Sequence, residues 1–295
     1  NYNILHQFDP VNNGGGASPS GSLILSDGKL YGLTSGGGTA GFGSLFEYNI
    51  SGGQFNAKVI FENAPFGSSP KGDLTKSGNI WYGMASNGGN FNNGTIFIFD
   101  PAGSGTMGVL HQFSGMDGAI PTGNLLLFNG NLYGMTSEGG NNNGGVLFEF
   151  NLTTSIYTVK HHFNNGNLPM GSLIEINGVF YGLTSNGGTG FGNLFMFNPT
   201  NNTYTSVHTF NGAQGKFPFG DLVQMDGLLY GMTTTANTHP GVLFRFDPNL
   251  LTFEVMHYFS GGMADGGSPY GSLVIRNGIL YGMTRDGGNQ SQGTI

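Results

Sequence analysis

Leu30-Tyr31-Gly32-Leu33-Thr34 decides the fold of this chain, because the same aromatic-glycine pattern returns five more times. The intervals between the repeated tyrosines are 51, 51, 48, 49 and 51 residues. These tyrosines are Tyr31, Tyr82, Tyr133, Tyr181, Tyr230 and Tyr281. A period of this length is too long for one turn of a solenoid and matches one four-stranded blade of a propeller. The spacing therefore predicts six structural repeats, which we number from first to sixth by these tyrosines.

Each repeat has the same internal plan, and its hydrophobic pattern has a period of two rather than a helical period. It begins with Pro-x-Gly-(Ser/Asp/Asn)-Leu, followed by a short apolar strand and a turn such as Asn129-Gly130. Asn-Gly and Asp-Gly between apolar runs are the strongest local signal for a hairpin. The Tyr-Gly strand, a loop rich in Gly and Asn, an alternating third strand and a fourth strand ending in His-x-Phe follow. This plan predicts an all-β, six-bladed β-propeller with four antiparallel strands in each blade.

The two ends of the chain indicate how the predicted ring closes. The chain starts with a lone fourth strand at residues 2–8 and stops within a third strand at Gly293-Thr294-Ile295. We therefore expect residues 1–295 to form a single propeller in which strand 2–8 completes the last blade, residues 271–295. Such closure leaves no sheet edge unpaired. Because the other third strands are longer, we also expect the natural chain to continue beyond Ile295.

The composition favours an extracellular protein and argues against several classes of partner. Only 8% of the residues are charged, against about 25% in ordinary soluble domains. The nine Lys and Arg residues are not clustered and the net charge is −7, so the chain offers no basic surface for nucleic acid. No apolar run approaches the ~18 residues that span a bilayer, and we expect no membrane insertion by this segment. With no cysteine, disulfides are excluded.

No catalytic or metal-binding constellation stands out among the titratable residues. The equivalent histidines sit on fourth strands at the expected outer rim, where they cannot converge on one metal ion; we expect them to pack between repeats, and we predict no metal and no cofactor. These histidines are His6, His111, His161, His208 and His257. Asp73 and Asp221 occupy the same motif position three repeats apart, which leaves a weak catalytic alternative, with Asp117 or Asp265 as further acids. Their serine and asparagine equivalents favour a role in capping turns.

A weaker indication of a binding site comes from aromatic residues that differ between copies, whereas the framework residues repeat. They lie in the loops or in the Pro-x-Gly turns, on one predicted face: Phe42, Phe66, Phe91, Phe191, Phe219 and Tyr270. Aromatic faces beside amides and hydroxyls suit a glycan, and they suit a protein partner equally well. The alternative is that these rings fold back and fill gaps beneath glycine-rich loops.

The repeated Leu-Tyr-Gly-Met-Thr-Ser-x-Gly-Gly, followed by Gly-x-Leu-Phe and His-x-Phe, resembles the bacterial GloVer tandem-repeat family over all 295 residues. Departures are local: the fifth copy lacks the Gly-Gly loop, and Val59 replaces the histidine of the fourth strand that follows the first Tyr-Gly copy. The resemblance implies a secreted or surface-attached bacterial protein, with varied C-terminal anchoring signals, and transfers no catalytic residue.

The function expected first is therefore a non-enzymatic binding module at the bacterial cell surface, presenting one loop-rich face to a glycan or a surface protein. Two alternatives stay open: a polysaccharide hydrolase or lyase with acidic residues at the axial mouth, and a structural spacer within a larger surface protein.

Overall fold

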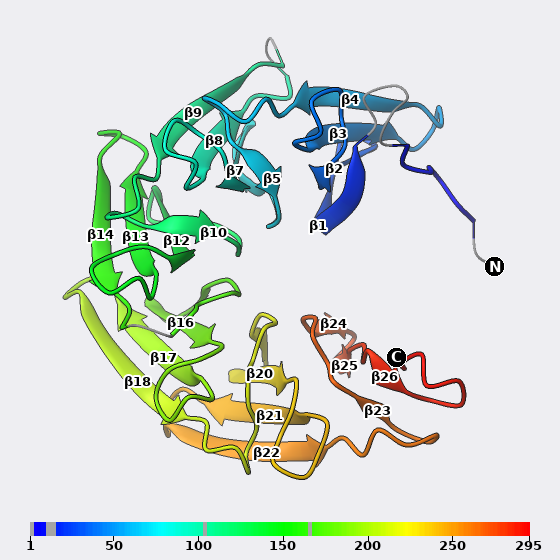
Figure 1. Ribbon diagram of the computed structural model, residues 1–295, viewed down its shortest axis with the longest axis vertical. Coiled ribbons are helices and arrows are strands. Elements are labelled where there is room, and N and C mark those ends of the chain that lie inside the picture. Colours follow the sequence, from blue (N-terminus) through cyan, green and yellow to red (C-terminus); the bar gives the residue numbers. More distant parts are fainter. Residues whose placement is uncertain (1–2, 10–15, 103–104, 165–166) are drawn as a thin grey trace. The chain divides into compact units, whose positions relative to one another are not determined.

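The computed structural model describes residues 3–9, 16–102, 105–164 and 167–295 (Figure 1). The chain divides into two compact units. Unit 1 comprises Asn1–Asn141 with Val146–Lys160, and unit 2 comprises Asn142–Gly145 with His161–Ile295. All regular secondary structure in the described residues is β, as the period-two pattern predicts.

Unit 1 contains the first two repeats and most of the third, each folded as an antiparallel sheet whose strands follow chain order. The first sheet is β1 (Ala17–Ser26), β2 (Lys29–Gly36), β3 (Ser44–Asn49) and β4 (Phe55–Ile60). The second is β5 (Ser68–Pro70) with β6 (Thr75–Ser77), then β7 (Ile80–Asn87), β8 (Thr95–Phe99) and β9 (Met107–Gln112). The third is β10 (Ala119–Pro121) with β11 (Leu126–Phe128), then β12 (Asn131–Glu138), β13 (Val146–Asn151) and β14 (Tyr157–His162).

Unit 2 contains two further sheets of this kind and a sixth repeat that is paired differently. The fourth sheet is β15 (Ile174–Ile176), β16 (Val179–Thr184), β17 (Asn193–Asn198) and β18 (Thr203–Thr209). The fifth is β19 (Val223–Met225), β20 (Leu228–Thr233), β21 (Val242–Asp247) and β22 (Thr252–Tyr258). In the sixth repeat, β23 (Gly266–Gly267) pairs with β26 (Asp286–Gly287), and β24 (Val274–Arg276) pairs with β25 (Ile279–Tyr281).

The two-residue turns have the backbone that their sequences predict. Asn129 and Gly130 have φ of 48° and 76°, the left-handed values that a type I′ hairpin turn requires at both central positions. Both residues are left-handed in four other copies as well, at residues 27–28, 177–178, 226–227 and 277–278. These turns confirm the predicted hairpins and set the register of the first two strands in these five repeats.

In the first three repeats the proline of the Pro-x-Gly motif pairs with the second strand, so it belongs to the sheet rather than to the connection that precedes it. Pro70 pairs with Ala85 and, five residues later, Thr75 pairs with Tyr82. The same interruption separates β10 from β11, and it appears as a register shift between Ser20 and Ile24 in β1. A proline lacks the N–H that a ladder residue donates, which agrees with a break in the pairing at this motif.

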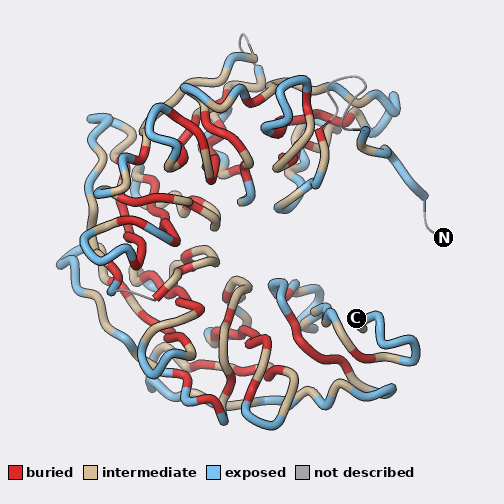
Figure 2. Tube along the Cα trace, in the orientation of Figure 1, coloured by how far each residue is buried: buried red, intermediate tan, exposed pale blue. Residues whose placement is uncertain are grey.

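The core lies along the strands, while the loops are exposed (Figure 2). In the third repeat, Gly134 of β12 pairs with Phe148 of β13, whose ring is completely buried. A Cβ built on Gly134 would meet the tip of that ring at 2.6 Å. The Tyr-Gly signature therefore exists because the glycine leaves the space that the third-strand phenylalanine fills.

The structure confirms the antiparallel sheets of the predicted propeller, but it does not confirm six blades or a closed ring. Among the described residues, five repeats form four-stranded antiparallel meanders, and the sixth does not. Residues 3–9 contain no strand, and Tyr2 of the predicted strand 2–8 lies outside the described residues. Within unit 1, His6 stacks on Phe55 at 3.8 Å between ring centroids. Closure of one domain over residues 1–295, with strand 2–8 completing residues 271–295, stays a prediction.

Candidate functional site

Four of the five repeated histidines, His6, His111, His161 and His208, stack on a ring of the repeat that follows them, as predicted. The ring of His111 stacks on Tyr157 with centroids 3.7 Å apart, and that of His208 stacks on Phe253 at the same distance. His161 stacks on Tyr204 at 4.0 Å. Burial lowers the pKa of His161 and of His208 to about 4, so both rings are neutral at pH 7 and act as packing elements.

Asp73 joins three repeats of unit 1 through backbone and side-chain contacts. Its carboxylate accepts a hydrogen bond from the backbone N–H of Ser22 in the first repeat. Its own N–H donates to Asn124 Oδ1 in the third repeat at 2.5 Å, and Asn124 Nδ2 donates back to Asp73 Oδ2 at 3.0 Å. Asp73 is thus held in a contact between successive Pro-x-Gly motifs.

Asp221 makes the equivalent contacts in unit 2. The N–H of Ser172 in the fourth repeat donates to Asp221 Oδ1 at 2.6 Å, and the N–H of Asp221 donates to Ser272 Oγ in the sixth at 2.8 Å. Both carboxylates of the weak catalytic alternative therefore occupy one structural position, which the serine and asparagine equivalents also serve. Their contacts favour the structural interpretation over the hydrolase or lyase alternative.

We expect Asp73→Ala to lower the free energy of unfolding by about 1–2 kcal/mol, because it leaves the Ser22 N–H without its charged acceptor. Asp73→Asn is the matched control, since its amide oxygen still accepts that bond, and it should cost less. Urea denaturation of the three proteins measures the difference. Unchanged stability together with loss of polysaccharide cleavage would instead identify Asp73 as catalytic.

Asp117 and Asp265 hold loops beside the repeated histidines. Asp117 accepts hydrogen bonds from the backbone N–H and the hydroxyl of Ser114, and its other oxygen lies 2.9 Å from His111 Nε2. Burial opposes ionisation of Asp117, but these hydrogen bonds outweigh it and lower the carboxyl pKa. Asp265 contacts Ser260 and His257 in the same way. These contacts favour a structural role for both carboxylates.

Three of the predicted ligand-binding aromatic residues belong to unit 1. Phe91 is the most exposed, with 59% of its surface accessible, and Phe42 is 37% exposed. Phe66 is half-buried, and its carbonyl accepts a hydrogen bond from Thr95 Oγ1 at 2.8 Å. Phe91 and Phe42 remain accessible to a ligand, whereas Phe66 contributes its backbone to the framework.

The other three lie in unit 2, and Phe191 is held in a local cluster. Its ring meets that of Phe217 edge-on at 6.2 Å, and Lys216 Nζ lies 4.7 Å from its centroid. The Phe217 N–H also donates to the Phe191 carbonyl at 3.0 Å. Phe191 is half-buried, so these contacts fit the alternative in which a loop ring folds back to fill space.

Phe219 and Tyr270 form an aromatic pair, which we call the aromatic platform. They occupy the middle position of the Pro-x-Gly motif in the fifth and sixth repeats. The two rings are nearly parallel, 5° apart in orientation, with centroids 5.6 Å apart. Gly220 of the first motif packs so closely on Gly271 of the second that a side chain on Gly220 would clash with the backbone. This close approach of the motifs brings the two rings together while Tyr270 stays 47% exposed.

A charged pair borders the aromatic platform. The Arg285 guanidinium lies 5.0 Å from the Tyr270 ring centroid and Nη1 is 3.3 Å from the phenolic oxygen. Arg285 Nη2 also pairs with Asp286 Oδ2 at 3.1 Å. Hydrogen bonds from Arg285 and Ser268 lower the pKa of Asp286, so the pair is charged at neutral pH and its net charge is zero.

Arg285, Asp286, Lys216 and Phe217 were not predicted from the sequence. The sequence did contain a sign of Arg285 and Asp286. Four of the other copies have a serine at the position of Arg285, as Ser137 shows, so the charged pair departs from the repeat pattern. Nothing in the pattern indicated that Lys216 covers Phe191. Within the described part of the chain, no group of three or more His, Cys, Asp or Glu side chains is placed to hold a metal ion.

Solved structures similar to this chain are β-propeller-like proteins. A chain of a nidogen/laminin complex matches with a TM-score of 0.55 and 15% identity, covering 82% of this chain and 80% of that one. A proposed 6-phosphogluconolactonase from Bacteroides uniformis matches with a TM-score of 0.62 and 14% identity, covering 92% and 79%.

The extracellular domain of a proposed hybrid two-component system from B. thetaiotaomicron matches with a TM-score of 0.58 and 15% identity. The match covers 95% of this chain and 35% of that one, so the chain corresponds to about a third of that protein's length. At these identities the similarity concerns the fold alone. A search of the curated proteins found no match.

The repeat pattern itself identifies the family. The model of the Gloeobacter/Verrucomicrobia repeat matches residues 1–131 and 102–295, which together span the whole chain. This agrees with the resemblance carried by the Tyr-Gly and His-x-Phe motifs. The chain belongs to the Gloeobacter/Verrucomicrobia repeat family.

Proposed function

We propose that this chain is a non-enzymatic, extracellular binding module that holds a neutral glycan against the aromatic platform. The observation that carries the proposal is the parallel pair of Phe219 and Tyr270, 5.6 Å apart and partly exposed. Aromatic faces bind the apolar C–H face of a sugar ring, and two adjacent rings offer a surface longer than one side chain provides.

The charged pair beside the platform supplies the polar part of such a site. Arg285 presents several N–H donors and Asp286 presents carboxylate oxygens, and sugar hydroxyls both donate and accept hydrogen bonds. Because the two charges compensate each other, the site favours a neutral ligand over a strongly anionic one.

The extracellular location rests on the family and on composition. The repeat family is found in bacterial extracellular proteins, and the weakly charged, glycine-rich composition suits that environment. Across the described residues, no helix has the length and apolar character of a membrane span. The solved extracellular domain from B. thetaiotaomicron has a similar fold.

The other four aromatic residues have smaller roles in the proposed binding. Phe91 and Phe42 are exposed enough to contact a ligand from unit 1. Phe191 and Phe66 are half-buried and fit better as loop supports. A surface-protein partner, a hydrolase or lyase and a spacer are the competing outcomes of the experiment.

The test is a glycan-array screen of the purified chain beside Phe219→Ala and Tyr270→Ala. We expect selective binding of neutral glycans and a loss of roughly tenfold or more in affinity in each variant, as for anchor aromatic residues at interfaces. Leu250→Ala is the matched control, because Leu250 is an exposed apolar residue of unit 2 on another turn. It should bind like the unmodified chain, and melting temperatures show that each variant is folded.

The screen also separates the alternatives. Including Phe91→Ala and Phe191→Ala shows whether those loops take part. Binding that survives both platform substitutions would place the site elsewhere, whereas an array without any selective binding would contradict a glycan-binding function. Release of reducing sugar from a bound polysaccharide would identify an enzyme.

A further inference from the structure

The residue before the motif proline has a left-handed backbone in all six repeats, although none of the six is glycine. Their φ angles lie between 44° and 56°. Glycine adopts this conformation without strain, whereas a bulky side chain rarely does. The chain has 56 glycines, so a side chain at each of these strained positions favours a use for the side chain itself. The six residues are Ser18, Ser69, Ile120, Leu168, Phe217 and Ser268.

Phe217 is the aromatic residue of this set, and its backbone is fixed on both sides. Its N–H donates to the Phe191 carbonyl of the fourth repeat at 3.0 Å. Its carbonyl accepts hydrogen bonds from the N–H and the hydroxyl of Thr234, at 3.3 and 3.2 Å. Phe217 also meets the Phe191 ring edge-on, yet it is only half-buried. The residue is therefore held in place before a ligand arrives, which lowers the entropic cost of binding.

Lys216 supplies an amino group beside these two rings. Its backbone pairs with Thr235, and its Nζ lies 4.7 Å from the Phe191 centroid. In the described part of the chain, no carboxylate forms an ion pair with this amine. The amine can therefore donate hydrogen bonds to a bound hydroxyl group without losing an ion pair.

Phe217 and Lys216 lie next to the aromatic platform, and all of these residues belong to unit 2. Phe217 and Phe219 are separated only by the motif proline, so their Cα atoms are at most about 7 Å apart. The equivalent positions of the sixth repeat are both within reach of Arg285. Its N–H donates to the Ser268 carbonyl at 3.2 Å, and its guanidinium lies 5.0 Å from the Tyr270 centroid. One bound molecule can thus contact both positions of a motif.

We propose that Phe217 and Lys216 form a second binding subsite beside the aromatic platform, so that the bound glycan is a linear neutral chain of several sugar units. The inference rests on the proposed function and names the size class of its ligand. The platform contacts one part of the chain, and Phe217 contacts the C–H face of a further unit whose hydroxyls accept hydrogen bonds from Lys216. Phe191 supports the subsite through its contacts with both residues.

The test measures the affinity of the complete 295-residue chain for linear oligosaccharides of increasing length. The probes run from the monosaccharide to the hexasaccharide in each of several neutral homopolymer series: glucose, galactose, mannose, xylose and N-acetylglucosamine. In at least one series we expect the affinity to rise roughly tenfold from the disaccharide to the tetrasaccharide, because a second anchor ring is then engaged.

Two variants introduce residues that other repeats carry at the same positions. Phe217→Ser copies Ser268, whose φ is 52° against 56° for Phe217, and Lys216→Ala copies Ala119. Both are therefore compatible with the backbone of the repeat. We expect Phe217→Ser to abolish the gain in affinity between disaccharide and tetrasaccharide. Lys216→Ala should reduce tetrasaccharide affinity by roughly fivefold, the value of one hydrogen bond, whereas Tyr270→Ala should weaken binding at every length.

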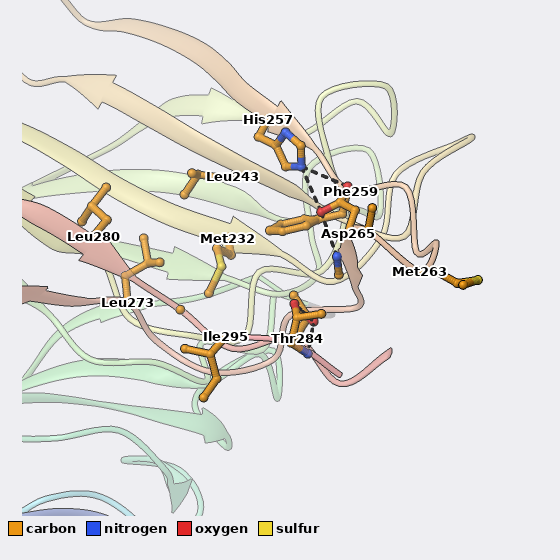
Figure 3. A pocket seen from close by; sticks show the side chains of 14 residues that line it. Met232, Leu243, His257, Phe259, Met263, Asp265, Leu273, Leu280, Thr284 and Ile295 are labelled. Carbon is orange, nitrogen blue, oxygen red and sulfur yellow. Dashed lines mark hydrogen bonds and ion pairs between the residues drawn. The ribbon is translucent and has the colours of Figure 1, made fainter. Parts of the chain in front are cut away.

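The matched control is Met263→Ala. Met263 is 74% exposed and lines a cavity of about 440 Å³ in the sixth repeat (Figure 3). The lining of that cavity includes no residue of the platform or of the second subsite, so this variant should bind every length like the unmodified chain. Melting temperatures show that each variant is folded.

Each other outcome rejects a particular claim. An affinity that stops rising at the disaccharide, or an equal loss at all lengths in Phe217→Ser, overturns the second subsite and leaves the platform proposal standing. A loss of binding in Met263→Ala places the glycan at the cavity instead and also overturns the subsite. If no series binds at any length, the proposed function is contradicted, and the subsite with it.

Discussion

Gly134→Val is expected to lower the free energy of unfolding by about 3 kcal/mol or more, which is the upper part of the range for overpacked cores. The reason is the 2.6 Å between a Cβ on Gly134 and the tip of the Phe148 ring. That ring is completely buried and also contacts Phe113 at 5.5 Å and Tyr157 at 5.3 Å. Because its neighbours surround it, the ring cannot move aside without disturbing two repeats.

The matched control is Gly282→Val, which places the same side chain at the equivalent position of the sixth repeat. There the nearest atoms are flexible side-chain ends beside a cavity, and valine has a higher strand propensity than glycine. We expect a change of less than about 1 kcal/mol. Equal losses of stability for the two variants in urea denaturation would contradict this explanation. The clash with Phe148 would then not be the reason why a glycine recurs opposite the third-strand phenylalanine.

A double substitution tests the pair directly. Phe148→Leu removes the ring that the new valine side chain of Gly134→Val would meet, so the two changes together should cost less than the sum of the single changes. Additive losses of stability would show that residues 134 and 148 do not interact energetically. The cycle measures whether the repeated glycine exists to accommodate the repeated phenylalanine.

The sequence was sufficient to predict the repeated sheets because each local signal repeats five or six times. Asn129-Gly130 and its equivalents specify a left-handed turn by their own backbone preferences, and the alternating pattern of β13 specifies its buried face. These are properties of neighbouring residues. The position of Pro70 inside the first strand was missed because the pairing of proline with Ala85 depends on the register of another strand.

The candidate site was predictable only in part. Phe219 and Tyr270 were selected because they vary at one motif position, and equivalent positions in successive repeats are brought together. Arg285 and Asp286 were missed although they depart from the pattern of the other copies, because the contact of Arg285 with Tyr270 depends on side-chain reach across the sixth repeat. The contacts of Asp73 with Ser22 and Asn124 likewise join residues about fifty positions apart.

The stability of the chain is expected to fall steeply between about pH 6.5 and pH 4 because of two buried histidines of unit 2, His161 and His208. The folded-state pKa of His161 and of His208 is about 4, below the ordinary value of 6.5. Between those two values the unfolded chain binds protons that the folded chain does not, so lowering the pH favours unfolding. Stability is therefore fully present above pH 6.5 and is lost progressively as the pH approaches 4, by about 2 kcal/mol for each histidine after allowing for partial exposure.

His208→Phe is the variant that isolates this effect. The His208 ring stacks on Phe253 at 3.7 Å, and its Nε2 is buried without a hydrogen-bond partner, so a phenyl ring keeps the stacking and removes an unsatisfied polar atom. Urea denaturation at pH 7, 6, 5 and 4 should show equal or higher stability at pH 7 and a shallower decline towards pH 4. His111→Phe is the contrasting variant, because His111 Nε2 lies 2.9 Å from Asp117 Oδ2 and the substitution removes that contact, so it should lower the stability at pH 7. A profile unchanged by His208→Phe would show that carboxylates, and not the stacked histidines, cause the loss of stability in acid.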